Sequence, residues 1–477
     1  MSLIVHGTNM RGKLVLRSRG KSANMCRSAF SNWGERVVQI ASYFPHLPGL
    51  RDDSAWTFAV SADDCELHFQ RQALTPRQLA DDKENKDIIG VLQMATQLLG
   101  RPADHTYLYE AFATAPYAAY LRRYQTMFAS LPLDPISPAH VHFAPRDDFY
   151  APLAEQGAPT EQVCIYLASG TNRRLHTSAE TLGVSQRVNS KMQLARDALR
   201  AGLRVPETVI LRKADLSTQV AADFIAAQGG SAMLKIMGLA GARNVTRIDS
   251  VAAATAFLEE FPEDLELLLQ APLDADRYTE MTVDLVVSDT DIQIANTRKL
   301  LFADGLWVGN YISEHLNLTA QQQADLLRVG EYVRQQGYSA AQGLNCGIDF
   351  FLDQHTGEVI VIEINARYTG GMIPAQVLKR LAVGARPAVV CFALVEVARF
   401  EDYMAFTERH LWRDDDAPFA SVSLGFSPYP IDVEGQQMML VWQLVIDDLA
   451  AFNRAKDAAL GSANLAVTNQ IEAVKDW

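Results

Sequence analysis

The segment Val359 to Arg367, which reads Val-Ile-Val-Ile-Glu-Ile-Asn-Ala-Arg, joins an apolar run to three alternating polar residues. The apolar run predicts a strand, and successive side chains of a strand point to opposite faces. Glu363, Asn365 and Arg367 are therefore expected on one face. A carboxylate and an amide oxygen suit Mg²⁺, and a guanidinium beside them suits phosphate charge.

A second carboxylate is expected opposite this segment. Residues 347–352 predict another strand, joined to the first by a turn at 354–357, and Asp349 occupies the place that corresponds to Glu363. Carboxylates within apolar strands are unfavourable unless a cation lies between them, and Mg²⁺ fits that role. The alternative is that both acids are edge-strand surface charges, with Arg367 as their ion-pair partner.

Two lysines lie upstream of this hairpin. Lys235 sits between apolar neighbours in a predicted strand, which calls for a buried anion, and the glycines Gly238 and Gly241 follow it. Such a loop can bring backbone N–H groups close to phosphates, although it can also simply shape a hairpin. Lys191 lies near the start of a predicted helix, where a solvated surface lysine is the alternative.

The pattern from residue 163 onward predicts an α/β protein. The expected elements are strands over 163–168, 205–211, 232–237 and 265–270, helices over 189–202, 217–228, 250–261 and 318–337, a hairpin over 278–301 turning at 288–291, and an apolar helix near 387–399. Residues 1–150 show a mixed pattern without a recognisable motif. The chain has no internal repeat.

Composition narrows the functional classes. The 477 residues allow about two to four domains and hence a cleft between them. The net charge of −13 argues against nucleic acid as a partner, and no stretch is long and apolar enough to predict a membrane span. Five cysteines without a CxxC pair predict reduced thiols in a cytoplasmic protein.

The ordered set of Lys191, Lys235 with its glycine loop, Glu280 in Glu-Met-Thr-Val, Asp349 and Glu363 to Arg367 resembles the ATP-grasp superfamily over residues 185–390. Gly370-Gly371 after Arg367 looks like the amino-acid and peptide ligase branch. The resemblance implies an α/β fold with α+β subdomains. Its expected parts are an N-terminal α/β pre-ATP-grasp region over 1–187, ATP-grasp subdomains over 188–275 and 276–400, and a C-terminal extension over 401–477.

The same resemblance implies roles for individual residues. Phosphates would be held by Lys191, Lys235, Gly238 and Gly241, adenine by Gln270, Ala271 and Leu273, ribose by Glu280, and Mg²⁺ by Asp349, Glu363 and Asn365, with Arg367 and Arg298 as catalytic groups. Family members often carry glutamate where this chain has Gln270. A surface position is the alternative for Arg298, and a loop position without a role in binding is the alternative for His315.

The implied activity is ATP- and Mg²⁺-dependent joining of a carboxylate to an amine through an acyl phosphate, with ADP and phosphate released. Mn²⁺ can replace Mg²⁺ in such sites, and a homodimer is compatible with the resemblance. The implied partners are ATP, a small carboxylic or amino acid and an amine. The alternatives are a carboxylase or purine-type ligase of the same superfamily, or a nucleotide-binding regulator without turnover.

Overall fold

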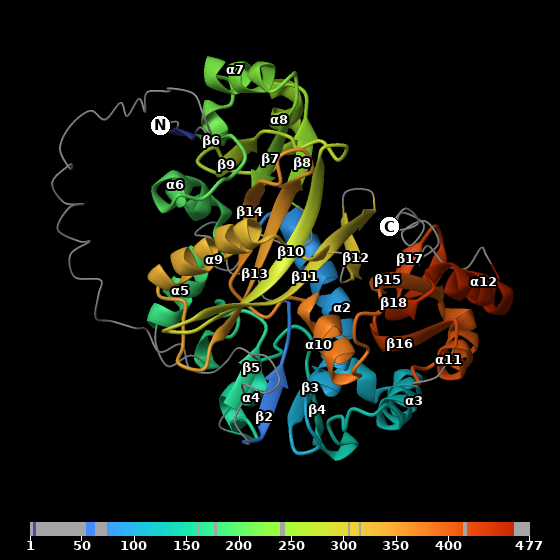
Figure 1. Ribbon diagram of the computed structural model, residues 1–477. Coiled ribbons are helices and arrows are strands. Elements are labelled where there is room, and N and C mark those ends of the chain that lie inside the picture. The colour runs from blue at the N-terminus through green and yellow to red at the C-terminus, as the bar shows by residue number, and fades with distance from the viewer. Residues whose placement is uncertain are drawn as a thin grey trace.

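The computed structural model of the chain describes residues 3–5, 54–62, 74–160, 162–175, 179–238, 244–303, 306–313, 316–413 and 417–461. The described residues form three sheets of four, five and nine strands. Figure 1 shows the five-stranded sheet at one end of the molecule and the four-stranded sheet at the other. Gly241, His315, Cys26 and Cys65 lie outside the described residues.

The four-stranded sheet is parallel, with strand order β4-β3-β2-β5. Its longest helix starts at a capping box, in which Thr75 and Gln78 exchange side-chain and backbone hydrogen bonds. The elements of this part are β2 (Trp56–Ala59), α2 (Pro76–Leu99), β3 (His105–Tyr109), η1 (Glu110–Ala113), α3 (Tyr117–Ser130), η2 (Pro138–His140), β4 (Val141–Ala144), α4 (Ala151–Gln156), β5 (Gln162–Ile165) and η3 (Arg173–Leu175).

The five-stranded sheet forms a small lobe with its own hydrophobic core, which includes Val209, Phe224 and Leu267. Its strands are antiparallel in the order β1-β6-β9-β7-β8. The alternation of helix and strand expected from the sequence is confirmed here. The elements are β1 (Leu3–Val5), β6 (Thr208–Arg212), η4 (Lys213–Asp215), α7 (Gln219–Ala227), β7 (Ala232–Ile236), β8 (Val245–Ile248), α8 (Val251–Phe257) and β9 (Glu266–Gln270).

The nine-stranded sheet is antiparallel and runs in the order β14-β13-β10-β11-β12-β15-β18-β16, with β17 paired to β18. Both predicted hairpins are present in it. Its strands are β10 (Tyr278–Val287), β11 (Ile292–Ala303), β12 (Leu306–Ile312), β13 (Leu344–Asp353), β14 (Val359–Asn365), β15 (Ala388–Glu396), β16 (Phe419–Phe426), β17 (Ile431–Val433) and β18 (Gln436–Asp447). The associated helices are α5 (Ala179–Val188), α6 (Lys191–Ala201), α9 (Ala320–Gln335), α10 (Met372–Arg380), η6 (Val397–Arg399), α11 (Phe400–Arg409) and α12 (Leu449–Leu460).

The expectation of an apolar helix near residues 387–399 is wrong. This segment forms strand β15 followed by the short turn η6, and β15 pairs with β12 on one side and β18 on the other. A short apolar run fits a buried strand as well as a buried helix, and neighbouring strands decide between them. Strand β15 is not an edge strand: β18 and β16, which come from residues beyond 400, continue the sheet on its far side.

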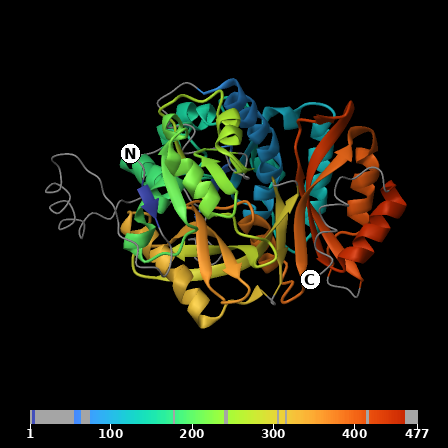
Figure 2. The same ribbon diagram turned by 90° about the horizontal axis from the view of Figure 1, so that it is seen from above.

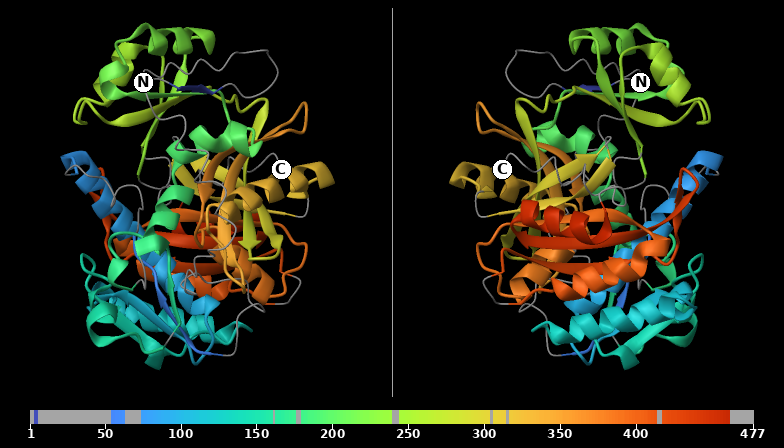
Figure 3. Two further views of the ribbon diagram at one scale, coloured as in Figure 1. Left: turned by 90° about the vertical axis from the view of Figure 1, so that its left-hand side faces the viewer. Right: turned by 90° about the vertical axis from the view of Figure 1, so that its right-hand side faces the viewer.

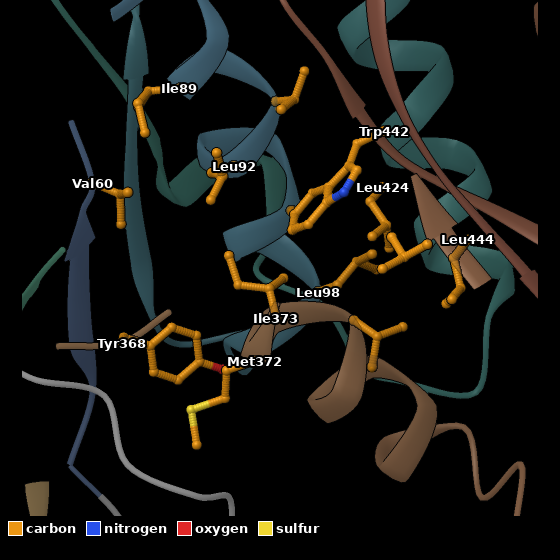
Figure 4. Packing of buried hydrophobic residues seen from close by; sticks show 14 of the residues in the cluster. Val60, Ile89, Leu92, Leu98, Tyr368, Met372, Ile373, Leu424, Trp442 and Leu444 are labelled. Atoms are coloured by element: carbon orange, nitrogen blue, oxygen red, sulfur yellow. The ribbon is translucent and has the colours of Figure 1, made fainter. Parts of the chain in front are cut away.

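Helix α2 packs between the four-stranded and nine-stranded sheets and joins these two into one core. Figure 4 shows Leu92 and Leu98 of α2 beside Ile373 of α10 and Trp442 of β18. In the view from above, the C-terminal strands lie on the opposite side of α2 from the small lobe (Figure 2). The side views separate the small lobe from the four-stranded sheet, with the nine-stranded sheet between them (Figure 3). Among the described helices, none is long and apolar enough to cross a membrane.

Candidate active site

The polar residues of the β13–β14 hairpin lie together, as their spacing predicts. Asp349 and Glu363 are direct partners in the strand register. The Asn365 amide nitrogen donates to Asp349 Oδ2 over 2.9 Å, and Arg367 Nη2 donates to Asn365 Oδ1 over 2.9 Å. The hairpin therefore gathers two carboxylates, an amide and a guanidinium into one cluster.

Lys191 reaches this cluster from α6. Ser190 caps the helix by accepting a hydrogen bond from the Gln193 backbone over 3.2 Å, which fixes Lys191 at the first helical position. Its Nζ donates to Glu363 Oε1 over 2.6 Å, and the side chain is only 16% exposed. The alternative of a solvated surface lysine is therefore wrong.

Lys235 approaches the cluster from β7 of the small lobe. Burial and the Lys191 charge lower its pKa to about 8, while Glu363, Glu280 and Asp349 act in the opposite direction. Among the described residues, the side chain of Lys235 has no hydrogen-bonded or ion-paired partner. The Lys235 ammonium group therefore lies near the acidic cluster without forming an ion pair with any single carboxylate of that cluster.

The acids themselves resist ionisation together. Burial and the neighbouring Asp349 charge raise the pKa of Glu280 to about 8. Burial and the Glu363 charge raise the pKa of Asp349 to about 6. Burial also opposes ionisation of Glu363, but Lys191, Arg367 and Lys235 together outweigh burial and lower the pKa of Glu363. A bound cation would offset the electrostatic repulsion between these neighbouring carboxylates.

The donor set fits Mg²⁺ shared with a phosphate ligand. Among the described residues, no group of three or more His, Cys, Asp and Glu side chains is arranged to hold a metal by itself. The carboxylates of Asp349 and Glu363 supply part of an oxygen shell; the Asn365 amide, which here turns its nitrogen to Asp349 and its oxygen to Arg367, would add its oxygen after rotation of the amide group. Mg²⁺ usually keeps one or two protein carboxylates and completes its six positions with water and phosphate oxygens, which is the composition this cluster allows.

The residues expected around adenine lie at the end of β9. Gln270 is buried, its Nε2 donates to Thr208 Oγ1 over 3.0 Å, and its Oε1 has no partner among the described residues. An unpartnered buried acceptor suits an amino group such as that of adenine. The Ala271 N–H is already used by Glu207 O at 2.8 Å, so only its carbonyl remains for a ligand, and Leu273 is partly exposed nearby.

Gly238 begins the loop after β7. Its φ of 96° lies in the region that favours glycine, and its carbonyl accepts from Asn244 Nδ2 over 2.8 Å. Asn244 is itself buried and tied to β7, because its backbone carbonyl accepts from Ile236. The sequence analysis did not single out Asn244, whose side chain hydrogen-bonds Gly238 across this loop.

Arg298 lies on β11, next to the acidic cluster, and is only 1% exposed. It pairs with Asp284, which is also 1% exposed, and it donates to Asn296 Oδ1. The alternative of a surface arginine is therefore wrong. Its Nε atom has no partner among the described residues and so could still bind a ligand.

Two further residues position Arg367 and were missed by the sequence analysis. Tyr166, just after β5, accepts a hydrogen bond from Arg367 Nη1 over 2.6 Å, and the guanidinium carbon lies 4.7 Å from its ring centroid. Asn189 Oδ1 accepts from the Ala366 N–H over 2.9 Å. Both contacts join segments more than a hundred residues apart, so no local pattern could reveal them.

Comparison with solved structures identifies the fold. N5-carboxyaminoimidazole synthetase from Staphylococcus aureus superposes with a TM-score of 0.50, at 10% identity over 87% of this chain and 100% of the other. Its ADP complex gives a TM-score of 0.52, at 10% identity over 88% of this chain and 100% of the other. No protein-family model matches the chain, and no curated protein sequence matches it.

These superpositions and the arrangement of the three sheets define the class of protein: the chain has the ATP-grasp fold. The expected fold class is confirmed. At 10% identity the likeness establishes the fold alone, so the activity must be argued from the site.

Proposed function

We propose that this chain is an ATP- and Mg²⁺-dependent ligase that joins a carboxylate to an amine. The observation that carries the proposal is that the small lobe, helix α6 and the nine-stranded sheet bring together Lys191, Lys235, Asp349, Glu363 and Arg367. Carboxylates, lysines and an arginine in this arrangement suit the binding and transfer of a phosphoryl group. The ADP complex of the Staphylococcus aureus structure supports a nucleotide ligand.

Each residue has a defined role in this proposal. Asp349, Glu363 and Asn365 would hold Mg²⁺, which when bound screens the charge of the ATP phosphates. Lys235 and Lys191 bind phosphate oxygens, Gln270 Oε1 accepts from the adenine amino group, and Glu280 binds ribose. Arg367, held by Tyr166 and Asn365, stabilises negative charge that develops at the reacting centre.

The proposed reaction has two steps. A carboxylate oxygen attacks the γ-phosphorus of ATP, the bond to the bridging oxygen breaks, and ADP leaves. An amine then attacks the acyl carbon, phosphate leaves with the bonding electrons, and the nitrogen loses a proton. Phosphorylation supplies the leaving group that a carboxylate lacks.

The test is ADP release from Mg-ATP over a panel of amino acids, other small carboxylic acids and amines, with bicarbonate as a separate arm. Substrate-dependent ADP release with an amide product is expected. Glu363→Gln is expected to remove most turnover while leaving the fold intact, and Arg367→Ala to lower kcat more than it weakens ATP binding.

The outcomes separate the alternatives. ADP release with bicarbonate alone would indicate a carboxylase. ATP binding without substrate-dependent ADP from any pair would indicate a regulator. Near-normal activity of Glu363→Gln would refute the assignment of the metal site.

A further inference from the structure

A row of side chains leads from the acidic cluster along one face of the nine-stranded sheet. Thr282, the register partner of Asp349, pairs with Arg298. Leu300 pairs with Asn310 and Phe302 with Trp307, so the alternation along β11 places Arg298, Asn310 and Trp307 on a shared face. The row therefore starts at the proposed metal site and ends at an indole ring.

The polar atoms of this row lack partners. Among the described residues, no hydrogen bond is made by Arg298 Nε, by either amide atom of Asn310, or by Trp307 Nε1, although each of these atoms is buried. Buried polar groups in proteins are nearly always hydrogen-bonded, so four such atoms along one sheet face call for an explanation. They comprise three donors and one acceptor.

The turn at Gly370 and Gly371 covers this row. A Cβ atom on Gly371 would lie 2.8 Å from Arg298 Nε and 2.8 Å from Asn310 Nδ2. A Cβ atom on Gly370 would lie 3.6 Å from Trp307 Cη2 and 3.8 Å from the Tyr166 hydroxyl that binds Arg367. The turn thus links the unpartnered atoms to the arginine of the proposed reaction.

We propose that this row binds an α-amino acid as the acid substrate, an inference that rests on the proposed ligase function. Its carboxylate accepts from Arg298 Nε and Asn310 Nδ2, and its ammonium donates to Asn310 Oδ1. The Trp307 indole donates to the second carboxylate oxygen. The amino acid reaches these buried atoms when the Gly370-Gly371 turn shifts.

Charge selects an amino acid over a phosphorylated substrate. Asp284 already balances the Arg298 guanidinium in a buried ion pair. The row therefore offers hydrogen bonds without net positive charge, which suits a zwitterion of zero net charge. A phosphate dianion would remain uncompensated in this buried setting. The ring of Trp307, edge-on to Phe392 with centroids 5.3 Å apart, favours an apolar side chain on the amino acid.

Two substitutions test this assignment without removing any side-chain hydrogen bond seen among the described residues. Asn310→Leu and Trp307→Phe delete polar atoms that have no hydrogen-bond partner among the described residues, and Phe keeps an aromatic ring beside Phe392, so neither variant is expected to lose thermal stability through a broken hydrogen bond. Amino-acid affinity is expected to fall about 10- to 100-fold in Asn310→Leu and about 5-fold in Trp307→Phe, with the Kd for Mg-ADP unchanged. Trp412→Phe, whose ring contacts Arg386 elsewhere, is the matched control.

The experiment is calorimetric titration of the full chain, saturated with Mg-ADP, with each of the common L-amino acids and with ribose 5-phosphate as the phosphorylated probe. Binding of an amino acid that both variants weaken, with Trp412→Phe unchanged, supports the inference. Binding of ribose 5-phosphate but of no amino acid overturns it. Equal amino-acid affinity in wild type and both variants also overturns it, as does the absence of all binding.

ADP release separates this inference from the proposed function. Amino-acid binding that the variants weaken, without any ADP release, retains the binding site and rejects the ligase. ADP release with a carboxylate whose KM is unchanged in both variants retains the ligase and rejects the binding site.

Discussion

The buried pair of Arg298 and Asp284 makes a quantitative prediction about stability. Asp284→Asn keeps the shape of the side chain but removes its charge, and it leaves the guanidinium of Arg298 uncompensated at 1% exposure. Removing one member of a buried ion pair costs about 3–5 kcal/mol. The substituted amide still accepts the 2.8 Å hydrogen bond from Thr369, so we expect the lower end, about 3 kcal/mol.

This cost converts into a measurable shift. A unit of about 150–250 residues loses roughly 2–4 °C of thermal midpoint per kcal/mol, so Asp284→Asn is expected to lower the midpoint of the transition that includes this sheet by about 6–12 °C. The assay is differential scanning calorimetry of the full chain. The matched control is Asp325→Asn, because Asp325 pairs with the half-exposed Arg328 at 3.1 Å on the surface of α9. Such surface pairs contribute about 0.2–1 kcal/mol.

A midpoint for Asp284→Asn within the range of the control would refute the reasoning, because it would mean that the pair gains nothing from its burial. The double variant Asp284→Leu with Arg298→Met provides a second check. It removes both charges together and is expected to recover most of the lost stability. No recovery in the double variant would show that packing, and not the uncompensated charge, sets the cost.

The remaining predictions concern the site and the N-terminal sheet. Lys235→Met is expected to raise the Kd for Mg-ADP about 10- to 100-fold by calorimetry, since a charge-assisted hydrogen bond is lost, whereas the exposed Lys379→Met should not. Because the pKa of Asp349 is raised to about 6, protons compete with Mg²⁺ below that pH, and the apparent Mg²⁺ affinity in ADP-release assays should fall steadily there; a flat profile from pH 7 to 5 would contradict this. Burial and neighbouring histidines lower the pKa values of His105 and His142, whose facing nitrogens are 2.9 Å apart, so their protonation opposes folding and stability should fall as pH drops below the ordinary value of 6.5. In the His142→Asn variant, the fall in calorimetric midpoint with decreasing pH should be smaller than in the wild type. An equal fall in both proteins would show that the histidine pair has no role.

The hairpin of β13 and β14 is the part of the site that the local sequence predicted. Its turn and its alternation placed Asp349 opposite Glu363 and Asn365 beside them, and the register confirms this. The arrangement was predictable because a strand has a period of two and a short turn fixes which residues face each other. The Ser190 cap of α6 was equally local, and it places Lys191.

The error at β15 has the opposite cause. Its apolar residues gave no periodicity that could separate a helix from a strand, and hydrogen bonds from β12 and β18 decided the outcome. Tyr166 and Asn189 were missed because their contacts with Arg367 and Ala366 cross long sequence separations. Arg298 was expected in the cleft, but only packing could show that Asp284 balances its charge.

The sequence by itself determined the acidic hairpin, the order of the lysines along the chain and the alternation of strands and helices, because these depend on residue spacing and local geometry. Only the tertiary structure decided how the pieces meet. It brought Lys191 to Glu363 and Tyr166 to Arg367, and beneath the glycine turn it left the side-chain polar atoms of Asn310 and Trp307 without hydrogen-bond partners in the described part of the chain. Contacts between distant segments depend on how whole sheets pack, which residue spacing along the chain does not encode.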